Sequence, residues 1–121
     1  MKVPRPRNPA LRLRATWPAP HAVRITARGA IDTTTAADLA TLVSDRLRAA
    51  PDRLVLDLSE VDFLGVAGIR VLLRAALQAS QNGTELVVEA GTNSLVRRAL
   101  RVTGADRRLA ISIGRPEPAP A

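Results

Sequence analysis

The sequence contains no cysteine and no tyrosine, and among its 121 residues there are one histidine, one tryptophan and one phenylalanine. The absence of cysteine excludes disulfides, thiolate metal sites, iron–sulfur clusters and cysteine nucleophiles. The histidine, His21, follows a proline at the entrance of a predicted strand, so no Ser-His pair has a credible catalytic spacing. The scarcity of aromatic side chains removes the stacking platforms that single-strand nucleic-acid binders use.

Signals for nucleotides, membranes and metals are also missing. The sequence has neither a Walker motif nor G-x-G-x-x-G, and no apolar run approaches the ~20 residues that span a bilayer. The N-terminus is basic but lacks the apolar core of a signal peptide. Asp57, Glu60 and Asp62 lie close together, but a hard-cation site needs more converging oxygens and glycines to bend the loop. We therefore expect a cytoplasmic, non-enzymatic protein without a metal or cofactor.

The positive charge is concentrated at one end of the chain. The formal net charge is +7, and residues 1–31 hold seven of the 18 bases and none of the 11 acids, so bases and acids balance in the rest. A basic N-terminal segment, Lys2 to Arg14, suggests a nucleic-acid-associated protein as an alternative function. Abundant arginine and alanine also follow from a GC-rich genome without selection for binding. We expect nucleic acid not to be the partner.

The length predicts one domain with two flanking segments. Prolines and basic residues predict an extended arm over residues 1–10, and prolines also punctuate a tail over residues 114–121. Residues 11–113 are the predicted folded part. Alternation of apolar and polar residues, apolar spacing of three and four, and Gly and Pro punctuation predict its elements. These are strands at 11–17, 21–29, 54–58, 85–89 and 109–113, and helices at about 36–50, 66–82 and 93–103.

The order β-β-α-β-α-β-α-β predicts an α/β fold, because helices that join strands require a parallel or mixed sheet. We expect a mixed, mostly parallel sheet of four to five strands with helices packed on one face, and a hairpin at its start. Leu54–Leu58 is typical of a central strand covered on both faces. A loop is predicted from Ser59 to Gly65. Gly83 should end the second helix, and Thr92 should cap the third. The second helix should bury Ile69, Leu72, Leu73, Ala76 and Leu77.

The most informative segment is 54–73, in which a strand ending in Asp-Leu-Ser precedes a loop with an aromatic residue, a glycine and an aliphatic helix. This arrangement resembles the STAS domain of bacterial anti-sigma-factor antagonists. Residues 29–32, Gly-Ala-Ile-Asp, resemble the family's Gly-Glu-Leu-Asp, and residues 95–105 resemble its last amphipathic helix and glycine turn. The resemblance covers about residues 11–113. It implies a STAS-like fold and a protein-binding regulator of transcription.

Residues 65–68, Gly-Val-Ala-Gly, stand where this family usually has Asp-Ser-Ser-Gly or Asp-Ser-Thr-Gly. The resemblance implies that Ala67 occupies the phosphoacceptor position, and without a hydroxyl it cannot accept the phosphate that adds about −1.5 to −2 charge there. Three interpretations remain: a constitutively active antagonist, a domain whose partner does not use phosphorylation, and a degenerate domain retained for folding. Thr33, Thr34 and Ser59 are alternative acceptors.

The resemblance also implies a partner-binding surface, made by two loops and the helix after them. It comprises Asp32, Thr33, Thr34, Asp62, Phe63, Leu64, Gly65, Val66, Ala67, Gly68, Arg70 and Arg74. Arg70 and Arg74 would form a rim that speeds encounter with an acidic surface, or a solvated helix face. Asp32 is equally typical of a turn or a helix cap, and Phe63 could equally fill the core. The implied partner is an anti-sigma factor with a histidine-kinase-like ATPase fold, and we also allow for a homodimer.

Overall fold

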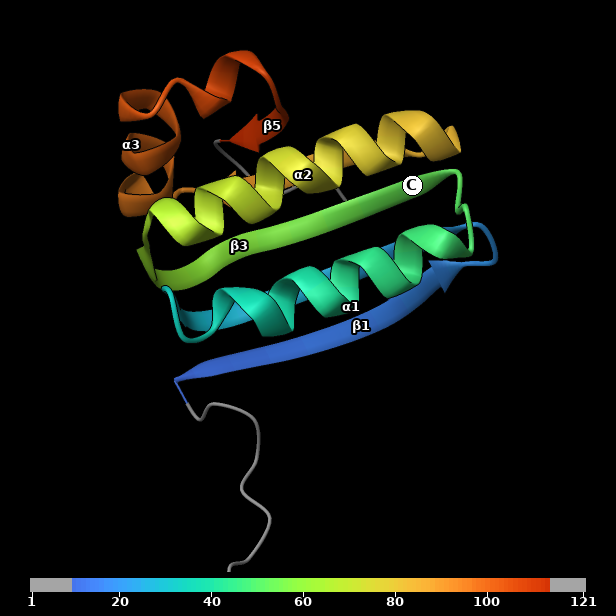
Figure 1. Ribbon diagram of the computed structural model, residues 1–121, viewed down its shortest axis with the longest axis horizontal. Helices are drawn as coiled ribbons and strands as arrows, with labels where there is room; N and C mark the ends of the chain where they lie inside the picture. The colour runs from blue at the N-terminus through green and yellow to red at the C-terminus, as the bar shows by residue number, and fades with distance from the viewer. Residues whose placement is uncertain (1–9, 114–121) are drawn as a thin grey trace, which may run out of the picture.

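The computed structural model describes residues 10–113. The predicted arm, apart from Ala10, and the predicted tail lie outside the described residues. Within them, one sheet is covered by helices on one face, and α1 and α2 run side by side across it (Figure 1). Buried apolar residues of the strands and helices make one continuous core.

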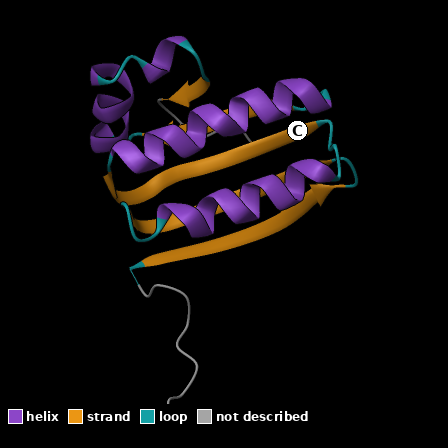
Figure 2. Cartoon of the chain, in the orientation of Figure 1, coloured by secondary structure: helices purple, strands orange, loops and turns teal. Residues whose placement is uncertain are grey.

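The elements follow the predicted order. They are β1 (Leu11–Ala19), β2 (Ala22–Ile31), α1 (Ala36–Arg48), β3 (Arg53–Leu64), α2 (Val66–Asn82), β4 (Glu85–Gly91), α3 (Ser94–Val102), a 3-10 turn (Ala105–Arg107) and β5 (Ala110–Ile113). The strands form one five-stranded sheet in the order β1-β2-β3-β4-β5. Figure 2 shows helices lying across the strands. Strands β1 and β2 are an antiparallel hairpin, and the other neighbours are parallel. Each crossover steps the same way across the sheet, so right-handed connections place the helices on one face. The predicted fold class is confirmed.

Strand β3 is central, but the prediction that it is covered on both faces is wrong. Leu54, Leu56 and Leu58 are fully buried against the helices, whereas Val55 and Asp57 between them are half-buried on the opposite face. The apolar character of the strand is therefore one-sided. The face away from the helices, which we call the open face, is the place where β2, β3 and β4 carry their charged residues.

The loop predicted for residues 59–65 is also wrong, because β3 continues to Leu64. Two irregularities in its pairing with β2 absorb extra residues of β3: Thr26 and Arg28 pair with Asp57 and Glu60, and Gly29 and Ala30 pair with Val61 and Phe63. Each irregularity breaks the period-two alternation that identifies a strand in a sequence. The segment therefore has a loop-like pattern although it is paired backbone.

The helix ends show one confirmed and one incorrect cap. Gly83 ends α2 in the left-handed conformation (φ 72°), as predicted. The cap of α3 is Asn93, not Thr92, and the Asn93 side chain accepts a hydrogen bond from the backbone N–H of Val96. The predicted apolar stripe of α2 is partly displaced. Leu77 is 62% exposed, and the residues that α2 buries are Gly68, Ile69, Leu72, Ala75 and Ala79.

Candidate functional site

The ends of β2 and β3 bring the two predicted loop segments together. The strands are parallel, Ile31 pairs with Leu64, and the backbone N–H of Gly65 donates to the carbonyl of Ile31 at 2.9 Å. Both chain segments therefore turn into their helices at the same edge of the sheet. Asp32 and the residues after it lie beside the Gly65–Gly68 turn, although more than thirty residues separate them in the sequence.

Asp32 organises the turn that leads into α1. Its Oδ1 accepts hydrogen bonds from the backbone N–H groups of Thr34 (2.8 Å) and Thr35 (3.1 Å) and from the Thr34 hydroxyl (2.7 Å). The hydroxyl of Thr34, the backbone of Thr34 and that of Thr35 hold the pKa of Asp32 below its ordinary value. Thr35 is buried, and its hydroxyl donates to the carbonyl of Ala30 at 2.8 Å. Asp32 thus has the turn role that its sequence context allowed, and the residue at the N-cap of α1 is Thr35.

The close packing of Ile31 and Leu64 leaves room only for a glycine at position 68. A Cβ on Gly68 would lie 2.6 Å from Cγ2 of Ile31 and 2.7 Å from Cδ1 of Leu64, which is closer than real Cβ atoms approach. Leu64 and Gly68 are buried, so these two residues of the predicted surface hold the turn in place and do not offer side chains to a partner. Gly65 precedes the first residue of α2, and no side chain caps the helix there.

Two apolar side chains project from this edge. Phe63 is 50% exposed and Val66 is 65% exposed, so the alternative in which Phe63 fills the core is wrong. The Phe63 ring lies over Gly65, because a Cβ on that glycine would be 3.0 Å from Cε2 of the ring. Asp62 beside it is exposed, and Ala67 is half-buried against the core. The exposed part of the turn is therefore small, apolar and uncharged except at Asp62.

Arg70 and Arg74 are exposed on α2, one and two turns beyond Ala67. Together with Ala67 they line a groove of about 450 Å³ between α1 and α2, whose wall on α1 includes Ala40 and Val43. The groove connects Ala67 to both arginines. The structure therefore places the predicted rim beside the turn.

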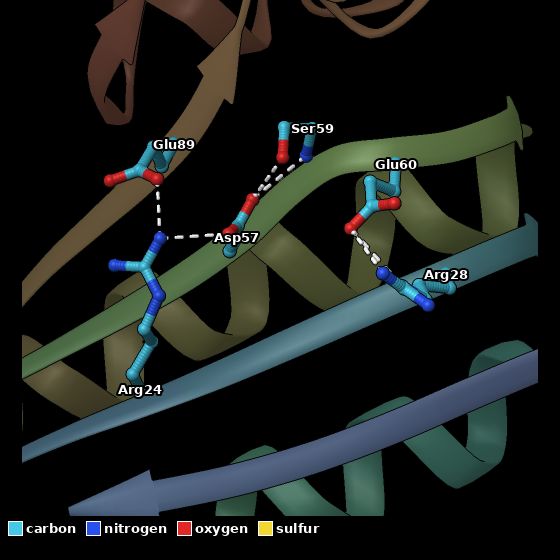
Figure 3. A network of polar contacts seen from close by, with 6 residues as sticks. All are labelled: Arg24, Arg28, Asp57, Ser59, Glu60 and Glu89. Atoms are coloured by element: carbon cyan, nitrogen blue, oxygen red, sulfur yellow. Dashed lines mark hydrogen bonds and ion pairs between the residues drawn. The ribbon is translucent and has the colours of Figure 1, made fainter. Parts of the chain in front are cut away.

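The sequence analysis missed a polar network on the open face. Nη2 of Arg24 on β2 lies 2.7 Å from Oδ2 of Asp57 on β3 and 2.5 Å from Oε1 of Glu89 on β4 (Figure 3). The Ser59 hydroxyl also donates to Asp57, at 2.6 Å. Burial alone would raise the pKa of Asp57, but hydrogen bonds from Ser59 and Arg24 outweigh it and hold that pKa below its ordinary value. Burial disfavours the charged form of Arg24, yet its bonds to Glu89 and Asp57 raise the pKa.

The network has a signal in the sequence, namely charged residues four positions apart on each of three strands. The contact between Arg24 and Asp57 can be recognised only when the strand register is known. In the backbone, Asp57 pairs with Thr26 and Glu89 and not with Arg24. Among residues 10–113, no group of three or more His, Cys, Asp or Glu side chains is placed to hold a metal ion. No helix in that part of the chain is long and apolar enough to cross a membrane.

The five-stranded mixed sheet with helices on one face defines a small α/β domain. A family model described as "Mlab, STAS domain" matches residues 17–113, and the chain belongs to this STAS family. The resemblance inferred from residues 29–32, 54–73 and 95–105 is confirmed.

Proteins similar in sequence or in structure include anti-sigma factor antagonists. The anti-sigma-F factor antagonist RsfB of Mycobacterium tuberculosis is 35% identical over 79 residues, which are 65% of this chain and 63% of RsfB. The chain thus matches less than two thirds of that relative's length. An anti-sigma factor antagonist from Mycobacterium paratuberculosis superposes with a TM-score of 0.76 at 24% identity, covering 88% of this chain and 86% of that one. Unphosphorylated SpoIIAA superposes with a TM-score of 0.70 at 12% identity, covering 84% and 88%. At these identities the two superpositions show the shared fold.

Proposed function

We propose that this protein is a non-enzymatic regulator that binds a partner protein through the turns after β2 and β3 and the start of α2. The observation that carries the proposal is the exposure of Phe63 at the end of β3 and of Val66 at the start of α2, beside the buried residues Leu64 and Gly68. Large apolar side chains that a rigid scaffold presents to solvent are typical of docking surfaces. Asp32 and its hydrogen-bonded threonines keep the neighbouring turn in one conformation.

The partner we propose is an anti-sigma factor of the histidine-kinase-like ATPase type. Support comes from the named relatives, which are anti-sigma factor antagonists. The two exposed arginines on α2 favour acidic groups at the edge of the partner's contact surface, because opposite charges at a rim speed association. The chain's own residues would supply apolar contacts at the centre and charge at the margin, which is the usual anatomy of an interface.

We further propose that binding is not switched by phosphorylation. Ala67 lies in the first turn of α2 and has no hydroxyl, and SpoIIAA, by contrast, is known in a phosphorylated form. Of the alternative acceptors, Ser59 is the least suitable, because its hydroxyl already donates to Asp57 at 2.6 Å. A phosphate there would meet that carboxylate and the one of Glu60 next to it. Thr33 is exposed and Thr34 is engaged with Asp32.

The binding proposal is tested by calorimetry with anti-sigma factors from the same cell. Val66→Asp places a charge in the centre of the surface and should weaken binding by about tenfold or more. Leu77→Asp is the matched control, because Leu77 is equally exposed on the same helix but near its other end. It should leave the affinity within about twofold. Equal losses in the two variants, or no binding by the wild type, would contradict the proposal.

The phosphorylation proposal is tested by incubation with ATP and the bound partner, followed by mass spectrometry. The wild type should carry no phosphate, and Ala67→Ser should become modified if the partner is a kinase of this class. Ala67→Glu should bind more weakly than Ala67→Gln, because only the former adds charge at the turn. Stoichiometric phosphate on Thr33, Thr34 or Ser59 of the wild type would overturn the proposal.

A further inference from the structure

The positive charges of the open face are balanced on β2, β3 and β4 but not on β1. Arg24 is paired with two carboxylates, and exposed ion pairs join Arg28 to Glu60 and Arg53 to Glu85. Arg12 and Arg14 of β1 are exposed on the same face and have no acidic partner within residues 10–113. The uncompensated charge of the described sheet therefore lies along its β1 edge.

The arrangement is unfavourable for the isolated domain. Arg12 lies directly opposite Arg28 across the β1–β2 hairpin, and Arg14 lies opposite Thr26. Like charges directly opposite one another destabilise an antiparallel pair. These four residues and Leu13 line a hollow of about 300 Å³ on the sheet. Arg28 is already paired with Glu60, so Arg12 and Arg14 are the two arginines at this hollow whose missing counter-charge a partner's carboxylates would supply.

The other side of β1 has the opposite character. A groove of about 640 Å³ runs between β1 and α1, and its apolar lining includes Leu11, Leu13 and Leu42. Its rim on α1 has mixed charge, because Asp38, Asp45 and Arg48 also line it, and Asp45 is paired with the neighbouring Arg46. The groove between β1 and α1 therefore suits apolar side chains of a bound segment better than acidic ones.

Strand β1 lies at the end of the sheet order, and no described strand pairs with its outer edge. A strand added to that edge would direct alternate side chains to the two sides of the sheet. We propose that the β1 edge binds an extended segment of a partner protein in which acidic and apolar residues alternate. Its acids would face Arg12 and Arg14, and its apolar residues would enter the groove beside Leu11 and Leu13. This second surface does not rest on the turn that carries Phe63 and Val66.

Other occupants fit less well. Two copies of the chain paired edge to edge along β1 would bring the rows of Arg12 and Arg14 against each other. A nucleic acid lying across the open face would meet Asp57, Glu60 and Glu89 on the adjoining strands. Arginines on an edge strand can also serve only to prevent aggregation. Each of these alternatives gives a different result in the experiment below.

The test measures fluorescence anisotropy of a labelled peptide, alternating glutamate with valine and long enough to pair with residues 11–16, titrated with the full chain. A peptide of the same composition with its glutamates in one block is the sequence control, and a labelled DNA duplex is the polyanion control. Arg12→Glu combined with Arg14→Glu should weaken binding of the alternating peptide by about tenfold or more. The pair Arg97→Glu and Arg98→Glu, on exposed positions of α3, changes net charge equally and should have an effect within about twofold.

Hydrogen exchange provides a second readout, since strand addition should slow exchange of amides in residues 11–16 selectively. Val66→Asp should leave peptide binding unchanged, so this proposal and the one on the turn surface fail separately. Any of four results would overturn the β1 proposal: no peptide binding, equal affinity for the block peptide, equal losses in both double variants, or preferential binding of DNA. Self-association that the neutral substitutions Arg12→Gln and Arg14→Gln strengthen, without peptide binding, would assign those arginines to edge protection instead.

Discussion

Replacement of Gly68 by alanine tests the contact that positions the turn before α2. Alanine is favoured over glycine within a helix by about 1 kcal/mol. The new methyl group would lie 2.6 Å from Ile31 Cγ2 and 2.7 Å from Leu64 Cδ1. Leu64 can move that terminal atom by a rotamer change, whereas Cγ2 of Ile31 is attached to the stiff β-carbon. Overpacking of this kind costs about 1–3 kcal/mol, so we expect a net loss of about 1 kcal/mol in unfolding free energy.

A double-mutant cycle separates the clash from other effects. Ile31→Leu conserves volume but removes the Cγ2 branch, so the two substitutions together should be about 1 kcal/mol more stable than the sum of their separate effects predicts. Gly83→Ala is the control, because its cost arises from a left-handed backbone (φ 72°) with nothing within 4 Å of the added methyl group. Urea unfolding followed by circular dichroism measures all the free energies. A Gly68→Ala variant as stable as the wild type, or equal coupling of Ile31→Leu to Gly83→Ala, would refute the argument.

Two further predictions concern polar groups. Asn93→Ala should lower the unfolding free energy by about 2 kcal/mol, because Nδ2 donates to the carbonyls of Ser59 (3.0 Å) and Val61 (2.7 Å) while Oδ1 caps α3. In the same urea titration Thr92→Ala should change it by less than about 0.5 kcal/mol, and equal losses would contradict the assignment. Asp57 favours its charged form when folded, so it stabilises the fold above its ordinary pKa of about 3.9 and loses that effect as pH falls through the lower folded pKa. The difference in Tm between wild type and Asp57→Asn should therefore narrow below about pH 4, and a gap independent of pH would contradict it.

The elements that the sequence predicted well are those with an unbroken period. Ile69 and Leu72 of α2 follow helical spacing, and Gly83 ends that helix because a left-handed residue is needed there. The sequence predicts that β3 ends at Leu58, because two pairing irregularities interrupt the alternation of apolar and polar residues. Only the pairing with β2 shows that the strand continues to Leu64. Which face of β3 is covered also depends on where all the helices pack, so it could not be decided from the strand alone.

The candidate surface was predictable as a set of segments but not side chain by side chain. Family resemblance located both turns, and parallel pairing of β2 with β3 brings them together. The irregular pairing decides that Leu64 points inward while Phe63 is exposed, and no local pattern distinguishes these neighbours. The same applies to the network of Arg24, Asp57 and Glu89, whose members come from three strands and meet only through the register.

The two proposed surfaces lie at connected places in the fold, and this affects how a partner would use them. Strand β1 begins where β2 ends, because Leu11 pairs with Gly29 and the N–H of Ala30 donates to the carbonyl of Ala10. Two residues beyond Ala30 the chain reaches Asp32 and the turn surface. A partner that contacts the turn could therefore extend a segment along β1, and the second contact would form at a high effective concentration. In that arrangement binding at each surface raises the apparent affinity at the other, although neither surface gains a contact. The arginines of β1 then add affinity for the same partner and do not recruit a second one.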